Sequence, residues 1–163
     1  MIKDTVETKK AILAVLCQQM VSRHRRSMEA IDRTRREAIN APGAMQSHSD
    51  TTKSQLGSLT TSLDGLVGET KQQIEVLKRF EFRESTILSV TIGSLVRIGV
   101  SPGEEELYFI LPVGGGETIR TDHFEQEVTV ITPQSPIGLE LMGKLTGDHF
   151  EFRRRRLTVV EVM

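Results

Sequence analysis

The chain has 163 residues, enough for one domain of ordinary size or two small ones. Hydrophobic residues make up 37% of it, with one Tyr and no Trp, so its core has to be aliphatic and modest in size. The longest apolar run, residues 11–17, is too short to span a membrane, and mixed charge near the N-terminus is unlike a signal peptide. The single Cys17 predicts a buried thiol in a reducing compartment. We therefore expect the protein to be cytoplasmic, and the short apolar run predicts no membrane partner.

The net charge of −1 is unevenly distributed between the two halves of the chain. Residues 1–82 contain 13 Lys and Arg against 10 Asp and Glu, whereas residues 83–163 contain 8 against 12. Neither half is basic enough to predict free nucleic acid as the main partner. The positive charge is local, which favours a specific contact.

Residues 1–82 predict an antiparallel helical hairpin. Downstream of a turn-like stretch at 40–44, steps of three and four residues define a heptad seam at Leu56, Leu59, Leu63, Leu66, Thr70, Gln73, Leu77 and Phe80. Upstream, helical spacing selects Val6, Leu13, Leu16, Met20, Met28, Ile31 and Ala38, with a stutter around His24. The two helices have about 35 and 30 residues, and the longer spans about 50 Å. Because such a hairpin buries little surface, we expect it to reach toward a partner.

Residues 83–163 predict a small antiparallel β domain with one short helix, so the fold class is α+β. Expected strands, separated by Gly- and Pro-containing turns, cover 89–100, 105–112, 127–132, 149–153 and 157–162. The helix begins with Ser135 as its cap and Pro136 in its first turn, and it ends at Gly143.

The stretch 130–144, followed by Gly147-Asp148 and a Val-rich closing strand, resembles the C-terminal domain of the Gre family of transcript cleavage factors. A hairpin placed before this strand–helix–strand order is similar to the same family. The resemblance implies an FKBP-like domain that docks on the rim of the secondary channel of bacterial RNA polymerase, with the hairpin inside the channel. The nascent RNA 3′ end and DNA are further contacts expected on this basis. The implied docking residues are Ser135, Pro136, Ile137, Gly138, Arg153 and Arg154.

The expected hairpin tip departs from the family pattern. In the family an Asp and a Glu, three residues apart, help to hold a second Mg²⁺, because a hard cation between phosphate oxygens needs oxygen ligands. The equivalent residues 41–46 contain no acid, so we expect a factor without cleavage activity. We also expect it to be a monomer, without a cofactor or metal. The alternative is that Glu37 or Asp50 supplies the acids. The predicted tip consists of Asn40, Pro42, Gly43, Met45, His48 and Asp50.

Two groups of arginines allow both a functional and a structural interpretation. A basic patch on the first helix, predicted to face RNA or acidic channel walls, consists of Arg23, Arg26, Arg33 and Arg36. The alternative is a solvated flank with pairs such as Glu29 and Arg33. The run 153–156 is either an exposed turn or a docking patch for an acidic surface.

Two other classes of function compete with a polymerase-binding factor. The hairpin, through its seam between Leu56 and Leu77, is a candidate for pairing with a second copy. An enzyme is not expected, because the histidines lack metal-ligand spacing and no nucleophile motif is present. A prolyl isomerase would need an aromatic-lined pocket, for which residues 83–163 offer Tyr108 and four Phe.

Overall fold

The computed structural model describes residues 5–40, 49–82, 89–120 and 126–163, with helical side chains described at 6–36, 61 and 64–82. Two long helices come first, α1 (Thr5–Asn40) and α2 (Ser49–Lys78). Contacts divide the chain into two compact units, Gln18–Glu75 and the combination of Met1–Cys17 with Val76–Met163. The predicted domain boundary after residue 82 stays a prediction. Among the described residues, neither long helix is apolar enough to cross a membrane.

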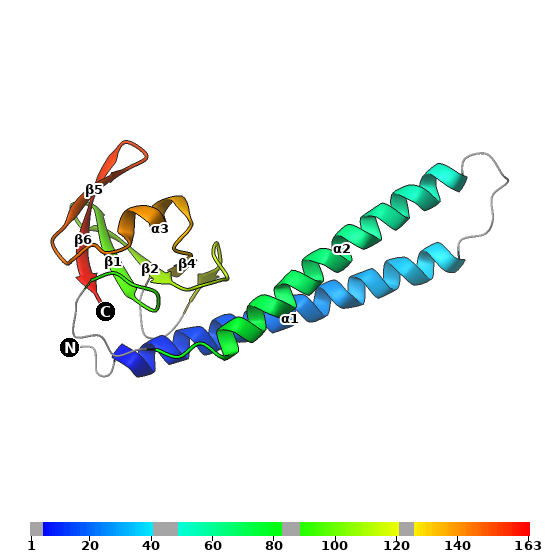
Figure 1. Ribbon diagram of the computed structural model, residues 1–163, viewed down its shortest axis with the longest axis horizontal. Helices are drawn as coiled ribbons and strands as arrows, with labels where there is room; N and C mark the ends of the chain where they lie inside the picture. The colour runs from blue at the N-terminus through cyan, green and yellow to red at the C-terminus, as the bar shows by residue number, and fades with distance from the viewer. Residues whose placement is uncertain (1–4, 41–48, 83–88, 121–125) are drawn as a thin grey trace. The chain divides into compact units, whose positions relative to one another are not determined.

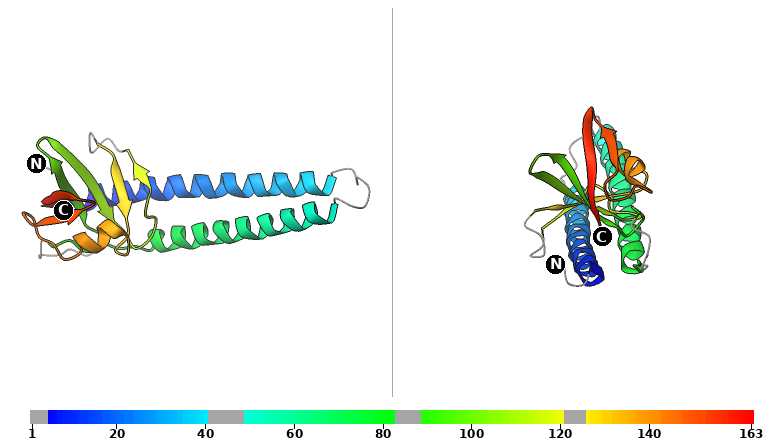
Figure 2. Two further views of the ribbon diagram at one scale, coloured as in Figure 1. Left: turned by 90° about the horizontal axis from the view of Figure 1, so that it is seen from above. Right: turned by 90° about the vertical axis from the view of Figure 1, so that its left-hand side faces the viewer.

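The unit 18–75 is a helical hairpin in which α1 and α2 lie side by side (Figures 1 and 2). Arg35 Nη2 and Asp64 Oδ2, 2.6 Å apart, join the two helices. On α2 the predicted seam holds at Leu77, which is fully buried, but not at Leu66, which is 59% exposed, and Ile74, outside the predicted seam, is 4% exposed. Met28, also predicted to face the partner, is 40% exposed. Spacing alone cannot choose between neighbouring apolar positions such as Leu66 and Val67, since each lies at a helical spacing from other seam residues.

The base of the hairpin belongs to the second unit and is better packed. Buried side chains on α1 advance there in steps of four, at Thr8, Ile12 and Leu16. Cys17, predicted to be buried, is half-buried, and burial raises the pKa of its thiol despite the opposing effect of Lys78. The residues that follow α2 carry this packing toward the sheet.

The same unit contains a six-stranded sheet. Its strands are β1 (Leu95–Ser101), β2 (Glu104–Ile110), β3 (Thr118–Ile119), β4 (Val128–Ile131), β5 (His149–Phe152) and β6 (Arg155–Val162). They are ordered β3-β4-β2-β1-β6-β5, with every pair antiparallel except β2–β4, which is parallel. The short helix α3 (Pro136–Leu141) follows β4 (Figure 1). The predicted α+β class, a helical hairpin followed by a small sheet with one helix, is confirmed.

Three details of the sheet differ from the sequence-based expectation. The two-residue β3 lies in a stretch predicted as a connection, because so short a strand carries no alternation signal. The β2–β4 pair is parallel because β4 begins at the same end of the sheet as β2, which requires a long connection between the two strands. β1 begins at Leu95, six residues later than predicted, since a turn with Gly93 at φ 92° precedes it.

Both faces of the sheet are covered. On one face, α3 packs over a core cluster made of Val90, Val96, Ile98, Ile110, Ile131, Ile137, Leu141, Phe150, Leu157, Val159 and Val162. On the other face the Phe82 ring stacks on Phe109 of β2, with ring centroids 6.0 Å apart, and meets Phe80 edge-on at 5.2 Å. The Lys9 ammonium lies 6.0 Å from the centroid of the Phe82 ring, and burial lowers the pKa of Lys9. The residues that follow α2, Phe80 and Phe82, therefore pack against this face of the sheet.

The start of α3 explains the Ser-Pro-Ile-Gly sequence in structural terms. Ser135 Oγ accepts a hydrogen bond from the Gly138 N–H at 3.1 Å and donates one to the Thr132 carbonyl at 2.8 Å. Pro136 occupies the first turn, where its missing N–H is not needed. A Cβ on Gly138 would lie 2.0 Å from the Thr132 carbonyl oxygen, so only glycine fits. Ser135 and Pro136 at the helix start agree with the prediction.

Replacing Gly138 with Ala is expected to lower the free energy of unfolding by about 1–3 kcal/mol, because the clash is with backbone. Gly68→Ala on α2 is the matched control. A Cβ there meets nothing within 4 Å, so helix propensity predicts a gain of about 0.5–1 kcal/mol. Urea unfolding of both variants measures the difference, and effects of the same sign would contradict this account of the turn.

Candidate functional site

The predicted tip is covered only in part. Pro42, Gly43, Met45 and His48 lie outside the described residues. Asn40 is the last residue of α1 and Asp50 the second of α2, and their side chains are also outside the description, as is that of Glu37. Which acidic residues this segment contains is therefore known from the sequence alone.

The predicted basic patch separates into two parts on α1. Arg26, Arg33 and Arg36 are exposed and share a flank of the helix, since they are spaced by seven and three residues. Arg23, although exposed, lines a hollow between α1 and α2. Glu29, which the sequence offered as a partner of Arg33, has its Oε1 3.8 Å from the Nε atom of Arg25 on the preceding turn.

The interhelical hollow has a volume of about 240 Å³. Its lining residues are Arg23, His24, Ser27, Ala30, Ile31, Thr34, Leu66, Val67 and Thr70. The space exists because the seam has small side chains here, such as Ser27 and Thr34, where a coiled coil would place leucines. The His24 Nδ1 atom is buried and has no hydrogen-bond partner within the described part of the chain. The interface between α1 and α2 is therefore incompletely packed beside the flank that carries the exposed arginines.

The implied docking residues are not all on the surface. Pro136 is exposed and Ser135 is half-buried, but Ile137 is 9% exposed within the core and Gly138 is buried against Thr132. Leu139 on α3 and Met142, the residue after its end, are exposed. These apolar side chains give no signal of exposure in the sequence, because their spacing on a two-turn helix resembles that of core residues.

The run of four arginines forms a two-residue hairpin turn between β5 and β6. Arg155 pairs with Phe152, which leaves Arg153 and Arg154 as the turn residues, with φ of 52° and 65°. Two left-handed residues in succession match a type I′ turn, which usually takes Asn-Gly. For a residue with a Cβ each such conformation costs about 1–2 kcal/mol. The sequence predicted the turn but not the left-handed backbone conformation of its two central residues.

Beside this turn lies the arginine-turn hollow, of about 370 Å³. It is lined by Val100, Glu106, Tyr108, Ile137, Phe152, Arg153, Arg155 and Leu157, from strands β1, β2, β5 and β6 and from α3. The Arg153 guanidinium lies 5.3 Å from the centroid of the Phe152 ring. Tyr108 donates its hydroxyl hydrogen to Glu106, and burial, followed by that bond, raises the pKa of Tyr108. The hollow therefore combines an apolar floor with a cationic rim.

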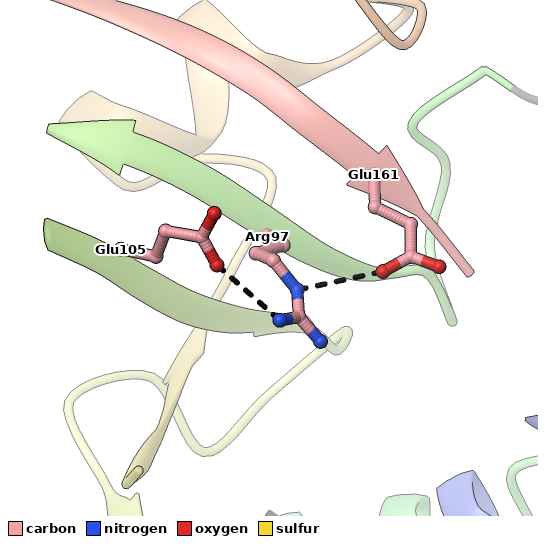
Figure 3. Close-up of polar contacts among 3 residues, drawn as sticks. All are labelled: Arg97, Glu105 and Glu161. Atoms are coloured by element: carbon pink, nitrogen blue, oxygen red, sulfur yellow. Dashed lines mark hydrogen bonds and ion pairs between the residues drawn. The ribbon is translucent and has the colours of Figure 1, made fainter. Parts of the chain in front are cut away.

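A polar cluster on the other face of the sheet is structural (Figure 3). Arg97 on β1 lies between two carboxylates, with Nη1 3.2 Å from Glu105 Oε2 and Nε 3.4 Å from Glu161 Oε2. The first contact is a hydrogen bond, whereas the Nε atom is misaligned for one and makes an ion pair only. Three adjacent strands, β2, β1 and β6, are thereby joined. Within the described ranges, no group of three or more His, Cys, Asp and Glu could hold a metal ion.

Replacing Arg97 with Met is expected to lower the free energy of unfolding by about 1–3 kcal/mol, because two carboxylates lose the charge between them. Arg97 is 27% exposed, whereas Arg120, paired with Glu127, is 87% exposed. Arg120→Met is therefore the matched control, with an expected loss below about 0.5 kcal/mol. Chemical denaturation at low salt measures both, and equal losses would contradict the assignment.

Tyr108→Phe tests the contact with Glu106 through its pH dependence. The folded chain binds the tyrosine proton more tightly than the unfolded chain, in which the pKa is about 10. Above that pH the unfolded state loses the proton first, so the contribution of Tyr108 to stability, complete at neutral pH, falls as pH rises. The stability difference between wild type and variant should therefore shrink above pH of about 10. A difference that is constant with pH would be the contrary result.

No family model matches the sequence, and no curated protein matches it. Solved structures described as Gfh1 are similar to it over most of both chains. One, named a transcription factor, is 18% identical, with 91% of this chain and 93% of that chain covered and a TM-score of 0.37. Gfh1 of Thermus aquaticus is 15% identical (89% and 92%, TM-score 0.35), and so is GreA factor homolog 1 of Thermus thermophilus (90% and 94%, TM-score 0.35). At these low values none establishes a family for this chain.

Proposed function

We propose that this chain is a Gre-like transcription factor that binds bacterial RNA polymerase and does not stimulate transcript cleavage. The proposal rests on a combination of fold and sequence. A 36-residue and a 30-residue helix form a hairpin, and the same chain continues into a sheet whose α3 starts with the Ser-Pro-Ile-Gly sequence typical of Gre C-terminal domains. In this proposal the sheet domain docks at the secondary channel and the hairpin enters it.

The charge of the hairpin supports a partner that is negatively charged. Arg26, Arg33 and Arg36 are exposed on one flank, and the carboxylates paired with other arginines, Glu29 and Asp64, are bound to Arg25 and Arg35. Channel walls or the nascent RNA 3′ end would both be attracted to such a flank. Contact with DNA is a weaker part of the proposal and has no separate support in the described residues.

The absence of cleavage follows from the composition of residues 41–46. They contain no carboxylate, and a second Mg²⁺ at the polymerase centre requires one or more negatively charged oxygen ligands. Glu37 and Asp50 flank this stretch and are the residues that would have to substitute. We propose that they do not, that the protein has no catalytic activity of its own, and that it acts as a monomer in competition with true cleavage factors.

The first test measures binding and cleavage with the same proteins. The wild-type chain is expected to bind RNA polymerase core enzyme but to leave the rate of RNA cleavage in backtracked complexes unchanged. A Glu37→Ala, Asp50→Ala double variant should behave like the wild type in both measurements. The controls are a cleavage factor with an acidic tip, which should raise the rate, and the same factor mixed with excess wild-type chain, which should raise it less.

Three results would count against the proposal. No affinity for the core enzyme would remove it altogether, whereas cleavage that disappears in the double variant would make this a genuine cleavage factor. The exposed apolar side chains of Val21, Met28 and Leu66 on the hairpin favour a second candidate, a coiled-coil protein that pairs with its own copy. Sedimentation as a tight dimer at micromolar concentration, without polymerase binding, would support that candidate instead.

A further inference from the structure

The turn between β5 and β6 has a sequence that its backbone does not favour. Arg153 and Arg154 both occupy the left-handed region, at φ of 52° and 65°, where Asn and Gly are the usual residues. Arginine brings nothing to a tight turn that Asn-Gly would not supply with less strain. Non-glycine residues in this region are found where the surrounding structure has another use for their side chains. The use has to lie in the guanidinium groups.

The guanidinium groups face outward without carboxylate partners among the described residues. Arg153 to Arg156 are all exposed, and within residues 89–120 and 126–163 no ion pair links them to an acid. Glu106, the acid that lines the arginine-turn hollow, accepts the hydroxyl hydrogen of Tyr108. Four adjacent positive charges that repel one another are stabilised when an external anion joins them. The turn thus presents unused charge beside an apolar hollow.

The hollow identifies the kind of anion. Its floor is largely aliphatic, with Val100, Ile137 and Leu157, and its aromatic Phe152 is covered by Arg153 at 5.3 Å. Stacked nucleobases need open aromatic faces, whereas here Phe152 is covered and the other aromatic residue of the lining, Tyr108, is half-buried. Moreover, residues 83–163 contain 8 basic against 12 acidic side chains, so the domain repels a long polyanion. A volume of about 370 Å³ suits an aliphatic side chain with neighbouring backbone.

We propose that Arg153, Arg154 and Arg155, together with the arginine-turn hollow, recognise an acidic protein segment, with an apolar side chain in the hollow and carboxylates on the guanidinium groups. This inference rests on the proposed function, because the segment is placed on RNA polymerase. It assigns the selection of that segment to the strained turn, and the start of α3 then serves to hold the hollow in shape through Ile137. The attraction between the positive charges of the turn and the carboxylates of the segment supplies the affinity.

The decisive variant is Arg153→Asn, Arg154→Gly, which installs the dipeptide that the turn prefers. Its melting temperature is expected to equal or exceed that of the wild type, because the strain is removed. Its affinity for RNA polymerase core enzyme should fall by about tenfold or more at low salt, and its affinity should depend less on salt concentration. Arg120→Asn, which removes an exposed arginine beside β3 at the opposite edge of the sheet, is the matched control and should bind like the wild type.

A second variant separates charge from backbone. Arg153→Lys, Arg154→Lys keeps both positive charges and the same backbone demand, so a site that acts through charge should retain most of its affinity and its salt dependence. Single-stranded RNA, titrated against all four proteins, is expected to bind each of them equally weakly. This arm tests the competing class of ligand directly.

The outcomes are distinguishable from a failure of the proposed function. If the wild type binds the core enzyme and the Asn-Gly variant binds it equally well, the inference is overturned and the polymerase proposal stands. A Lys-Lys variant as weak as the Asn-Gly variant, or a loss of RNA affinity confined to the Asn-Gly variant, also overturns it. A wild type with no affinity for the core enzyme removes both proposals together.

Discussion

The contact on which the second unit depends is the stack of Phe82 on Phe109. Phe109 lies fully buried on β2, in the middle of the sheet, and the ring that covers it comes from the few residues after α2. The chain has six Phe, one Tyr and no Trp. Half of its phenylalanines, Phe80, Phe82 and Phe109, therefore lie together where the residues after α2 meet the sheet. An aliphatic sheet with both faces buried needs such a cover, since the short α3 can shield only one of them.

Much of this architecture could be predicted, because the signals are local. The two long helices and the start of α3 follow from spacing, capping and proline placement, which depend on neighbours along the chain. The exposure of Leu66 and the burial of Ile74 could not be predicted, since both depend on the partner helix. The β2–β4 parallel pair and the two-residue β3 likewise depend on where a long connection returns, which no short window of sequence contains.

The candidate site shows the same division between local and long-range information. The sequence singled out Ser135, Gly138 and Arg153 as docking residues, and in the structure Ser135 and Gly138 build a helix start through their contacts with Thr132. The arginine-turn hollow was not predicted, because its lining comes from four strands and one helix that are far apart in the chain. Arg97 was also missed. A lone arginine in a strand gives no sign that Glu105 and Glu161 lie on either side of it.

The small seam residues of the hairpin have a consequence for its motion. At the base, Ile12, Leu16 and Leu77 are fully buried, but farther along α1 the facing positions are Ser27 and Thr34 beside an unfilled space. Apolar area removed from water is what holds two helices together, so less of it means a smaller free energy for local opening. Backbone amide exchange should therefore be graded along the helix pair, slow at its base and faster beyond. A two-helix element of this kind can rearrange its middle while its base, which belongs to the same compact unit as the sheet, stays packed.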